Sequence, residues 1–126
     1  MTYIRYQSPT PNARGAFIGI FGLVNGLARD GLLTEEEESF RRTNNAWYDE
    51  AYTDPSTVDP TVYDRTLNPL AAAWFRTATT AWLLEPLPGY LQILQAHHVP
   101  CTKLHSPDPG RIIYSDPHQV VVVPHR

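Results

Sequence analysis

Aromatic side chains and two arginines gather around residues 52–67, the longest segment of the sequence without a helical or strand period. A pocket walled by aromatic rings and anchored by a few polar groups is the usual form of a small-molecule or peptide site. An arginine there can hold a carboxylate or phosphate through two parallel hydrogen bonds. We therefore predict a ligand-binding surface that consists of Trp47, Tyr48, Tyr63, Arg65, Trp74 and Arg76, with Tyr3 and Arg5 as weaker contributors.

The same residues also have a purely structural interpretation. Aromatic rings at helical spacing usually pack in a core, and Arg76 would then pair with Asp49 or Asp64 and fix the long loop. An open concave pocket at these residues favours ligand binding or catalysis. An Arg76 fully paired with buried carboxylates favours a module that interacts with another protein.

Residues 97–105 contain histidines and a cysteine, which are zinc-ligand types, but they lack the spacing of a zinc site. Such sites use pairs like C-x-x-C or H-x-x-x-H, and His97, His98, Cys101 and His105 form neither. Cys101 follows a proline at the start of an expected strand rather than a helix N-terminus, which would lower a thiol pKa. The glycines of residues 15–26 match no phosphate-binding loop. The sequence predicts no metal site, no catalytic cysteine and no cofactor.

Two helices are expected in the first half of the chain. Residues 14–28 place apolar side chains three and four positions apart, and Gly31 stands where a helix C-cap is expected. Thr34 and Glu37 have the spacing of a capping box, which predicts that a second helix begins there. The four glutamates after Thr34 suit the positive end of the helix dipole.

Two further helices are expected after the long loop. Residues 68–85 have Asn68 as a cap, Pro69 in the first turn and an alanine-rich continuation, which predicts a third helix. Residues 86–99 predict a shorter fourth helix.

Strands are expected at both ends of the chain. Residues 2–8 alternate as a short strand, and residues 101–106, 111–115 and 119–124 predict three more, joined by Asp-Pro turns into an antiparallel meander. The four valines at 120–123 leave no polar side, so both faces of that strand should be covered. We predict an α+β fold in a single domain over residues 1–126. In this fold an N-terminal strand and about four helices pack on a C-terminal, three- to four-stranded antiparallel meander.

Composition narrows the functional classes. With 42% hydrophobic and 18% charged residues, the chain resembles folded globular proteins. A net charge of −3 without a basic stripe disfavours nucleic acid as a partner. The longest apolar stretch, residues 16–28, is too interrupted for a membrane span, and no secretory signal is visible at the start. With one cysteine and hence no intrachain disulfide, we expect a soluble cytoplasmic protein without a membrane partner.

Three blocks, “WYDEAY”, “AAWFR” and “PGRIIYSDPHQVVV”, carry a resemblance to known proteins. With their surroundings they resemble a group of small actinobacterial proteins of unknown function, over residues 3–124. The resemblance implies kinship and supplies no activity.

The leading functional hypothesis is a non-enzymatic module. It would bind a small anionic or aromatic ligand, or a protein partner, through the aromatic and arginine surface around residues 44–76. One alternative is a small enzyme acting on a charged, nucleotide-like metabolite. Arg65 and Arg76 would then bind the anion, and Tyr63, Asp64 or His98 would act as acid or base. A third is a homodimer whose subunits cover the outer face of the valine strand. The sequence leaves these alternatives open.

Overall fold

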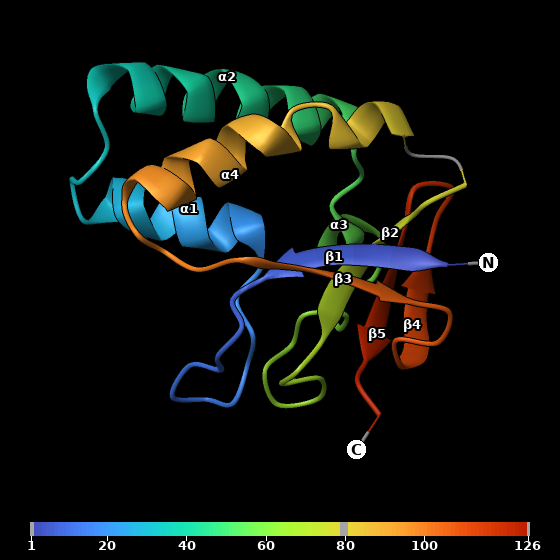
Figure 1. Ribbon diagram of the computed structural model, residues 1–126. Helices are drawn as coiled ribbons and strands as arrows, with labels where there is room; N and C mark the ends of the chain where they lie inside the picture. The colour runs from blue at the N-terminus through green and yellow to red at the C-terminus, as the bar shows by residue number, and fades with distance from the viewer. Residues whose placement is uncertain (1, 79–80, 126) are drawn as a thin grey trace.

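The computed structural model describes residues 2–78 and 81–125 as a helical layer on one face of a five-stranded sheet (Figure 1). The elements along the chain are β1 (Tyr3–Gln7), α1 (Ile20–Arg29), α2 (Glu35–Ala51), α3 (Pro55–Val58), β2 (Ala72–Arg76), the 3₁₀ helix η1 (Ala81–Leu84), α4 (Leu87–Ala96), β3 (Thr102–Ser106), β4 (Arg111–Ser115) and β5 (Gln119–Val123). The predicted α+β class is confirmed. Within the described residues, no helix combines the length and apolar character that crossing a bilayer requires.

The strand order is β3-β1-β2-β5-β4, and every neighbouring pair is antiparallel. The predicted meander of the last three strands is wrong. Only β4 and β5 form a hairpin, whereas β3 pairs along its whole length with β1, at the opposite edge of the sheet. A partner so distant in sequence leaves no trace in the local pattern of either strand.

The sheet is strongly curled, because residues 107–110 alone join its two edge strands, β3 and β4. In a flat sheet these strands would lie about 19 Å apart, four strand spacings. The linker spans at most about 18 Å when fully extended, and it is bent, since the backbone N–H of Asp108 bonds to Ser106 Oγ. Figure 1 shows β1 and β3 running across the view and β4 and β5 running up and down it.

The valine strand β5 is covered on both faces, as predicted. Val120 and Val122 pack with Tyr3 and Trp74 on the face away from helices α1, α2 and α4, where the curl of the sheet encloses them (Figure 1). Val121 points to the opposite face because side chains alternate along a strand. All three valines are fully buried within one chain, so this strand does not require a second subunit to cover it.

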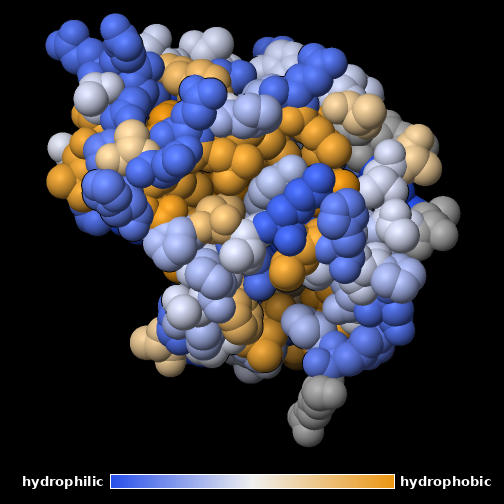
Figure 2. Space-filling view, viewed as in Figure 1, coloured by the Kyte–Doolittle hydropathy of each residue, from blue (hydrophilic) through white to orange (hydrophobic). Residues whose placement is uncertain are grey.

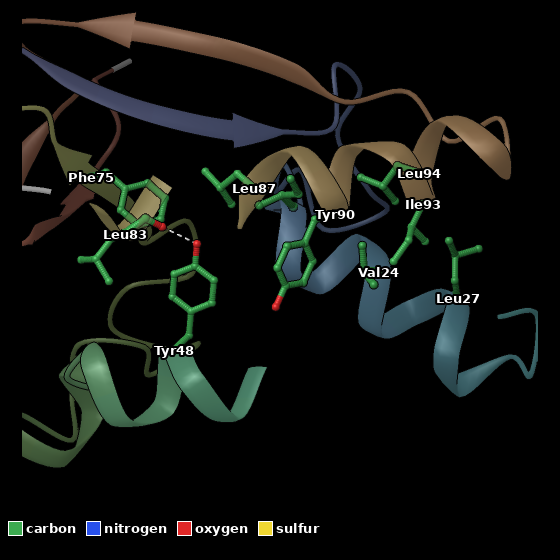
Figure 3. Packing of buried hydrophobic residues seen from close by; sticks show 10 residues of the cluster. Val24, Leu27, Tyr48, Phe75, Leu83, Leu87, Tyr90, Ile93 and Leu94 are labelled. Carbon is green, nitrogen blue, oxygen red and sulfur yellow. Dashed lines mark hydrogen bonds between the residues drawn. The ribbon is translucent and has the colours of Figure 1, made fainter. Parts of the chain in front are cut away.

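The main core lies between the helices and the other face of the sheet (Figure 3). Tyr90 of α4 stands at its centre, with its ring centroid 5.1 Å from those of Phe21 and Phe40 and 6.2 Å from that of Tyr48. Its hydroxyl donates a hydrogen bond to Asn45 Oδ1 at 2.7 Å. Helices α1, α2 and α4 are therefore joined through one aromatic cluster.

The helix predicted at residues 68–85 is wrong. Ala72–Arg76 form β2, an inner strand, and only Ala81–Leu84 take a short 3₁₀ helix; residues 79 and 80 of the predicted helix lie outside the described part of the chain. The side chain of Trp74 lies on the inner face of the curled sheet, whereas the side chain of Phe75 lies on the face that packs against the helices. A strand with aromatic residues on both faces shows no alternation of polar and apolar residues, and this is why its sequence resembles a helix.

The first two helices follow their local signals more closely. Helix α1 begins at Ile20 rather than Arg14, because residues 12–16 form a turn in which Asn12 Oδ1 accepts from two backbone N–H groups. Gly31 follows the helix with a φ of +71°, and the backbone N–H of Leu32 bonds back to Leu27 O. This arrangement is a Schellman cap. The predicted cap at Gly31 is therefore confirmed.

The predicted capping box of α2 is also confirmed, and it ties α2 to α4. Glu37 N–H donates to Thr34 Oγ1 at 3.1 Å, and Glu37 Oε1 accepts from Thr34 N–H at 2.9 Å. The same oxygen lies 2.8 Å from His97 Nε2, at the end of α4. These hydrogen bonds, first that with His97 and then that with Thr34, hold the pKa of Glu37 below its ordinary value of 4.5.

We expect the protein to lose stability as the pH falls below about 5 and through the lowered pKa of Glu37. A carboxyl whose pKa is depressed by folding stabilises the folded state while it is ionised, and this contribution disappears on protonation. Urea unfolding at a series of pH values should show a smaller acid loss for Glu37→Gln than for the wild type. The exposed Glu36→Gln is the control and should behave as the wild type. Equal acid losses in all three proteins would contradict the assignment.

Candidate functional site

An open cavity of about 700 Å³ lies between the helical layer and the sheet, within the volume range of sites for small organic molecules. Its walls combine rings from α1, α2, the long loop and the sheet: Tyr6, Phe21, Tyr48, Tyr52, Tyr63 and Phe75. On the molecular face shown in Figure 2, apolar side chains form a band between more polar regions above and below it. The cavity lining combines these six rings with seven polar or charged residues, and the polar groups decide what it can bind.

Arg5 reaches the cavity at the point where two strands part. The β1–β2 ladder ends at the pair Ile4 and Phe75. Further along, β1 is bridged instead by the segment before α1, where Gln7 pairs with Gly19. Arg5 lies between these two partners of β1, and a Cβ on Gly19 would lie only 3.4 Å from its guanidinium nitrogens.

The guanidinium of Arg5 spans the gap between β2 and this segment. Nη1 donates to Ala73 O at 2.9 Å, Nη2 donates to Phe17 O at 2.8 Å, and Nε donates to Gln7 Oε1 at 2.7 Å. A guanidinium has five N–H groups. Within residues 2–78 and 81–125, the other two N–H groups of Arg5 have no hydrogen-bond acceptor.

Arg5 also has no acidic partner in the described part of the chain. Burial lowers the pKa of its guanidinium, while the nearby ionisable groups of Tyr63, Tyr52 and Cys101 act in the opposite direction. An arginine nevertheless stays charged at neutral pH, because its pKa starts above 12. The cavity therefore contains a desolvated positive charge that no carboxylate in the described part of the chain pairs with.

Two phenol groups lie close to this charge. Burial raises the pKa of Tyr52 well above its ordinary value, and burial likewise raises the pKa of Tyr63. Both hydroxyls therefore keep their protons at neutral pH and can donate. In residues 2–78 and 81–125, neither hydroxyl has a hydrogen-bond partner. Arg5, Tyr52 and Tyr63, which we call the donor cluster, thus present unused donors in one part of the cavity.

The side of the cavity formed by helices α1 and α2 differs in charge from the donor cluster. Asp49 and Asn45 of α2 and Asn25 of α1 line it, and Asn45 Nδ2 donates to Asn25 Oδ1 at 3.0 Å. Asp54 also lines the cavity, but its carboxylate caps α3 and accepts from the backbone N–H of Ser56 at 2.9 Å. Neither carboxylate is among the charges that shift the pKa of Arg5. The cavity is cationic at the donor cluster and neutral to acidic at the helices.

The structure places two of the six predicted ligand-binding residues at the cavity. Tyr63 is 40% exposed at its rim, and Tyr48 is buried in its wall with its hydroxyl donating to Leu83 O (Figure 3). Trp47 lies outside it, with its ring 5.6 Å from that of Trp82. Of the weaker contributors, Arg5 lines the cavity and Tyr3 packs inside the curled sheet.

The other three predicted residues lie away from the cavity. Trp74 packs inside the curl of the sheet, and Arg65 is exposed on the long loop. Arg76 Nε donates to Asp116 O at 2.8 Å, and its Nη2 donates to Ser115 Oγ. Arg76 thus holds the turn between β4 and β5. The prediction that Asp49 or Asp64 would bind Arg76 is replaced by these backbone and hydroxyl contacts.

Tyr52 belongs to the aromatic residues around the long loop but was not among the six predicted site residues, and Gln119 was missed; both line the cavity. Gln119 carried a signal, because it is the one polar residue in an otherwise aliphatic strand, and it is fully buried.

The candidate metal ligands do not assemble: across the described ranges no three side chains of histidine, cysteine, aspartate or glutamate meet as a metal site. Burial raises the pKa of Cys101, which disfavours a reactive thiolate.

Comparison with models of protein families, with curated proteins and with solved structures finds no match to this chain. The resemblance to small actinobacterial proteins therefore stays a prediction. Conclusions about function depend on the cavity itself.

Proposed function

We propose that the protein is a binding module for a small organic anion, a carboxylate or phosphate with an apolar or aromatic body, held in the cavity between helices and sheet. The observation that carries this proposal is the partly buried, unneutralised guanidinium of Arg5 at the cavity wall. A buried charge without a partner is costly. An anionic ligand would offset this cost.

The donor cluster suits such a ligand. Two free N–H groups of Arg5 match the two oxygens of a carboxylate or phosphate, and Tyr52 and Tyr63 add hydroxyl donors. The rest of the lining includes four further rings, those of Tyr6, Phe21, Tyr48 and Phe75, against which an apolar or aromatic ligand body can pack. The anionic group of the ligand would then contact the donor cluster, and its apolar body would contact the aromatic rings.

A catalytic role has less support from the same residues. Asp64 and His98, which were candidates for acid–base chemistry, do not line the cavity. Asp64 Oδ1 instead accepts from the backbone N–H groups of Thr66 and Leu67 in its own turn. Burial raises the pKa of Tyr63, so this phenol is a poor base at neutral pH. Binding is the simpler use of these groups.

A matched pair of ligands tests the proposal. Isothermal titration calorimetry should detect binding of phenylacetate, while phenylacetamide, which has the same body but no charge, should bind at least about tenfold more weakly. That ratio corresponds to the loss of one hydrogen bond to a charged group. Equal affinity for the acid and the amide, or binding of neither, would overturn the proposal.

Variants locate the site. Arg5→Met should weaken phenylacetate binding at least about tenfold, and Arg5→Lys, which keeps the charge with fewer donors, should bind with intermediate affinity. Arg65→Met is the matched control and should bind as the wild type, because Arg65 lies outside the cavity. Circular dichroism verifies that each variant is folded. Loss of binding in Arg65→Met with full binding in Arg5→Met would place the site on the loop instead.

A further inference from the structure

Gln119 is the first residue of β5, fully buried, and faces the cavity beside Phe75 of β2. Its side-chain amide nitrogen donates to Thr53 O at 2.7 Å and to Asp116 Oδ2 at 3.0 Å. Its backbone N–H donates to Asp116 Oδ1 at 3.0 Å. In the parts of the chain that the structure describes, the side-chain oxygen Oε1 of Gln119 has no hydrogen-bond partner.

The orientation of this amide is fixed by its neighbours. Thr53 O and Asp116 Oδ2 are both acceptors, so a flipped amide would place oxygen against oxygen at each contact. Burial favours the neutral form of Asp116, but hydrogen bonds from His118, Gln119 and Tyr114 hold its pKa below its ordinary value. The carboxylate therefore stays ionised and holds the amide nitrogen. This leaves Oε1 as a fixed, unpaired acceptor.

We infer that Oε1 of Gln119 accepts a hydrogen bond from the bound ligand, so that the site selects organic anions that also carry an N–H or O–H donor. This inference rests on the proposed function. Buried carbonyl acceptors in folded proteins are almost always paired. Among the residues that line the cavity, Gln119 supplies a buried, unpaired acceptor and the donor cluster supplies the donors, so a ligand with both an anionic group and a donor satisfies both.

The ligand must rearrange one side chain to reach this oxygen, because Oε1 is enclosed in the structure. Tyr52 is a neighbour of Gln119: its ring lies 5.6 Å from that of Phe75, the strand partner of Gln119, and the next residue, Thr53, accepts from the Gln119 amide nitrogen. Its hydroxyl belongs to the donor cluster. Among the residues that line the cavity, we expect the Tyr52 side chain to turn when the ligand reaches Oε1.

The test compares phenylacetate with its ortho, meta and para hydroxy derivatives and with the corresponding methoxy derivatives, which keep the oxygen but lack the donor. By calorimetry, at least one hydroxy acid should bind about tenfold more tightly than both its methoxy counterpart and phenylacetate. In Gln119→Met the preferred hydroxy acid should bind as weakly as phenylacetate, while the affinity for phenylacetate changes less than about threefold. Gln92→Met, at an exposed position of α4, is the control and should keep the preference.

The two proposals fail in different ways. If acids bind through Arg5 but no hydroxy acid is preferred over its methoxy counterpart, the inference about Gln119 is wrong and the anion site stands. A preference that persists in a folded Gln119→Met variant likewise overturns the inference. Should Gln119→Met fail to fold, the comparison of hydroxy with methoxy acids on the wild type decides alone. If no acid binds the wild type, the proposed function is wrong and the inference is wrong with it.

Discussion

Replacing Tyr90 with alanine is expected to lower the free energy of unfolding by about 3–5 kcal/mol, the typical cost of removing a fully buried aromatic side chain. Tyr90 is fully buried, and its ring contacts those of Phe21, Phe40 and Tyr48. These rings come from α1 and α2, while Tyr90 comes from α4. The truncation would leave a cavity where all three helices meet.

Two companion variants separate the parts of this effect. Tyr90→Phe keeps the ring and loses the hydrogen bond to Asn45 Oδ1, so about 0.5–1.5 kcal/mol should be lost. Trp82→Ala removes a ring that is 42% exposed and should cost clearly less than Tyr90→Ala. Urea unfolding followed by circular dichroism measures all three. A loss below about 1 kcal/mol for Tyr90→Ala would show that the helical layer does not depend on this cluster.

The parts of the fold that sequence predicted correctly are those specified by neighbouring residues. Thr34 and Glu37 bond to each other three positions apart, and Gly31 adopts its left-handed conformation at the end of α1. Such caps act within one turn of the chain. Their sequence patterns therefore identify them without knowledge of the rest of the fold.

The failures come from interactions between residues far apart in the chain. The segment Ala72–Arg76 is alanine-rich and follows Asn-Pro, and it becomes a strand because β1 and β5 pair with it on either side. Its aromatic residues then face two different cores. Tertiary contacts override local propensity in such cases. The predicted meander failed for a related reason, since β3 pairs with a strand almost a hundred residues earlier.

The candidate site likewise depends partly on local sequence signals and partly on contacts between distant residues. The long loop lies at the cavity, and two of the predicted residues, Tyr48 and Tyr63, line it. The sequence favoured Arg76, which lies among aromatic residues, over Arg5, which lies in a short strand. The importance of Arg5 comes from the place where β1 leaves β2. No local pattern encodes where two strands part, so the structure was needed to find this residue.

Gly110→Ala is expected to lower the free energy of unfolding by about 2–4 kcal/mol through overpacking and backbone strain. Gly110 is buried just before β4 and has a φ of +156°. A Cβ there would lie 2.3 Å from Val123 O and 3.0 Å from Pro124 Cα. These are backbone atoms at the end of β5, where Val123 pairs with Arg111, so they cannot give way as a flexible side chain would. The last strand pair would have to open.

Gly31→Ala is the matched control, because Gly31 also has a positive φ but lies at the exposed end of α1, where an added Cβ would meet no atom within 4 Å. The Gly31→Ala substitution introduces backbone strain without a steric clash, so it should lower the free energy of unfolding by about 1 kcal/mol. Urea unfolding compares the two variants, and equal losses would show that the contact with β5 is not what excludes a side chain at Gly110.

Val123 lies at the opposite end of β5 from Gln119. Folded Gly110→Ala protein should therefore bind phenylacetate as the wild type does, which separates the stability of the β4–β5 hairpin from the chemistry of the cavity.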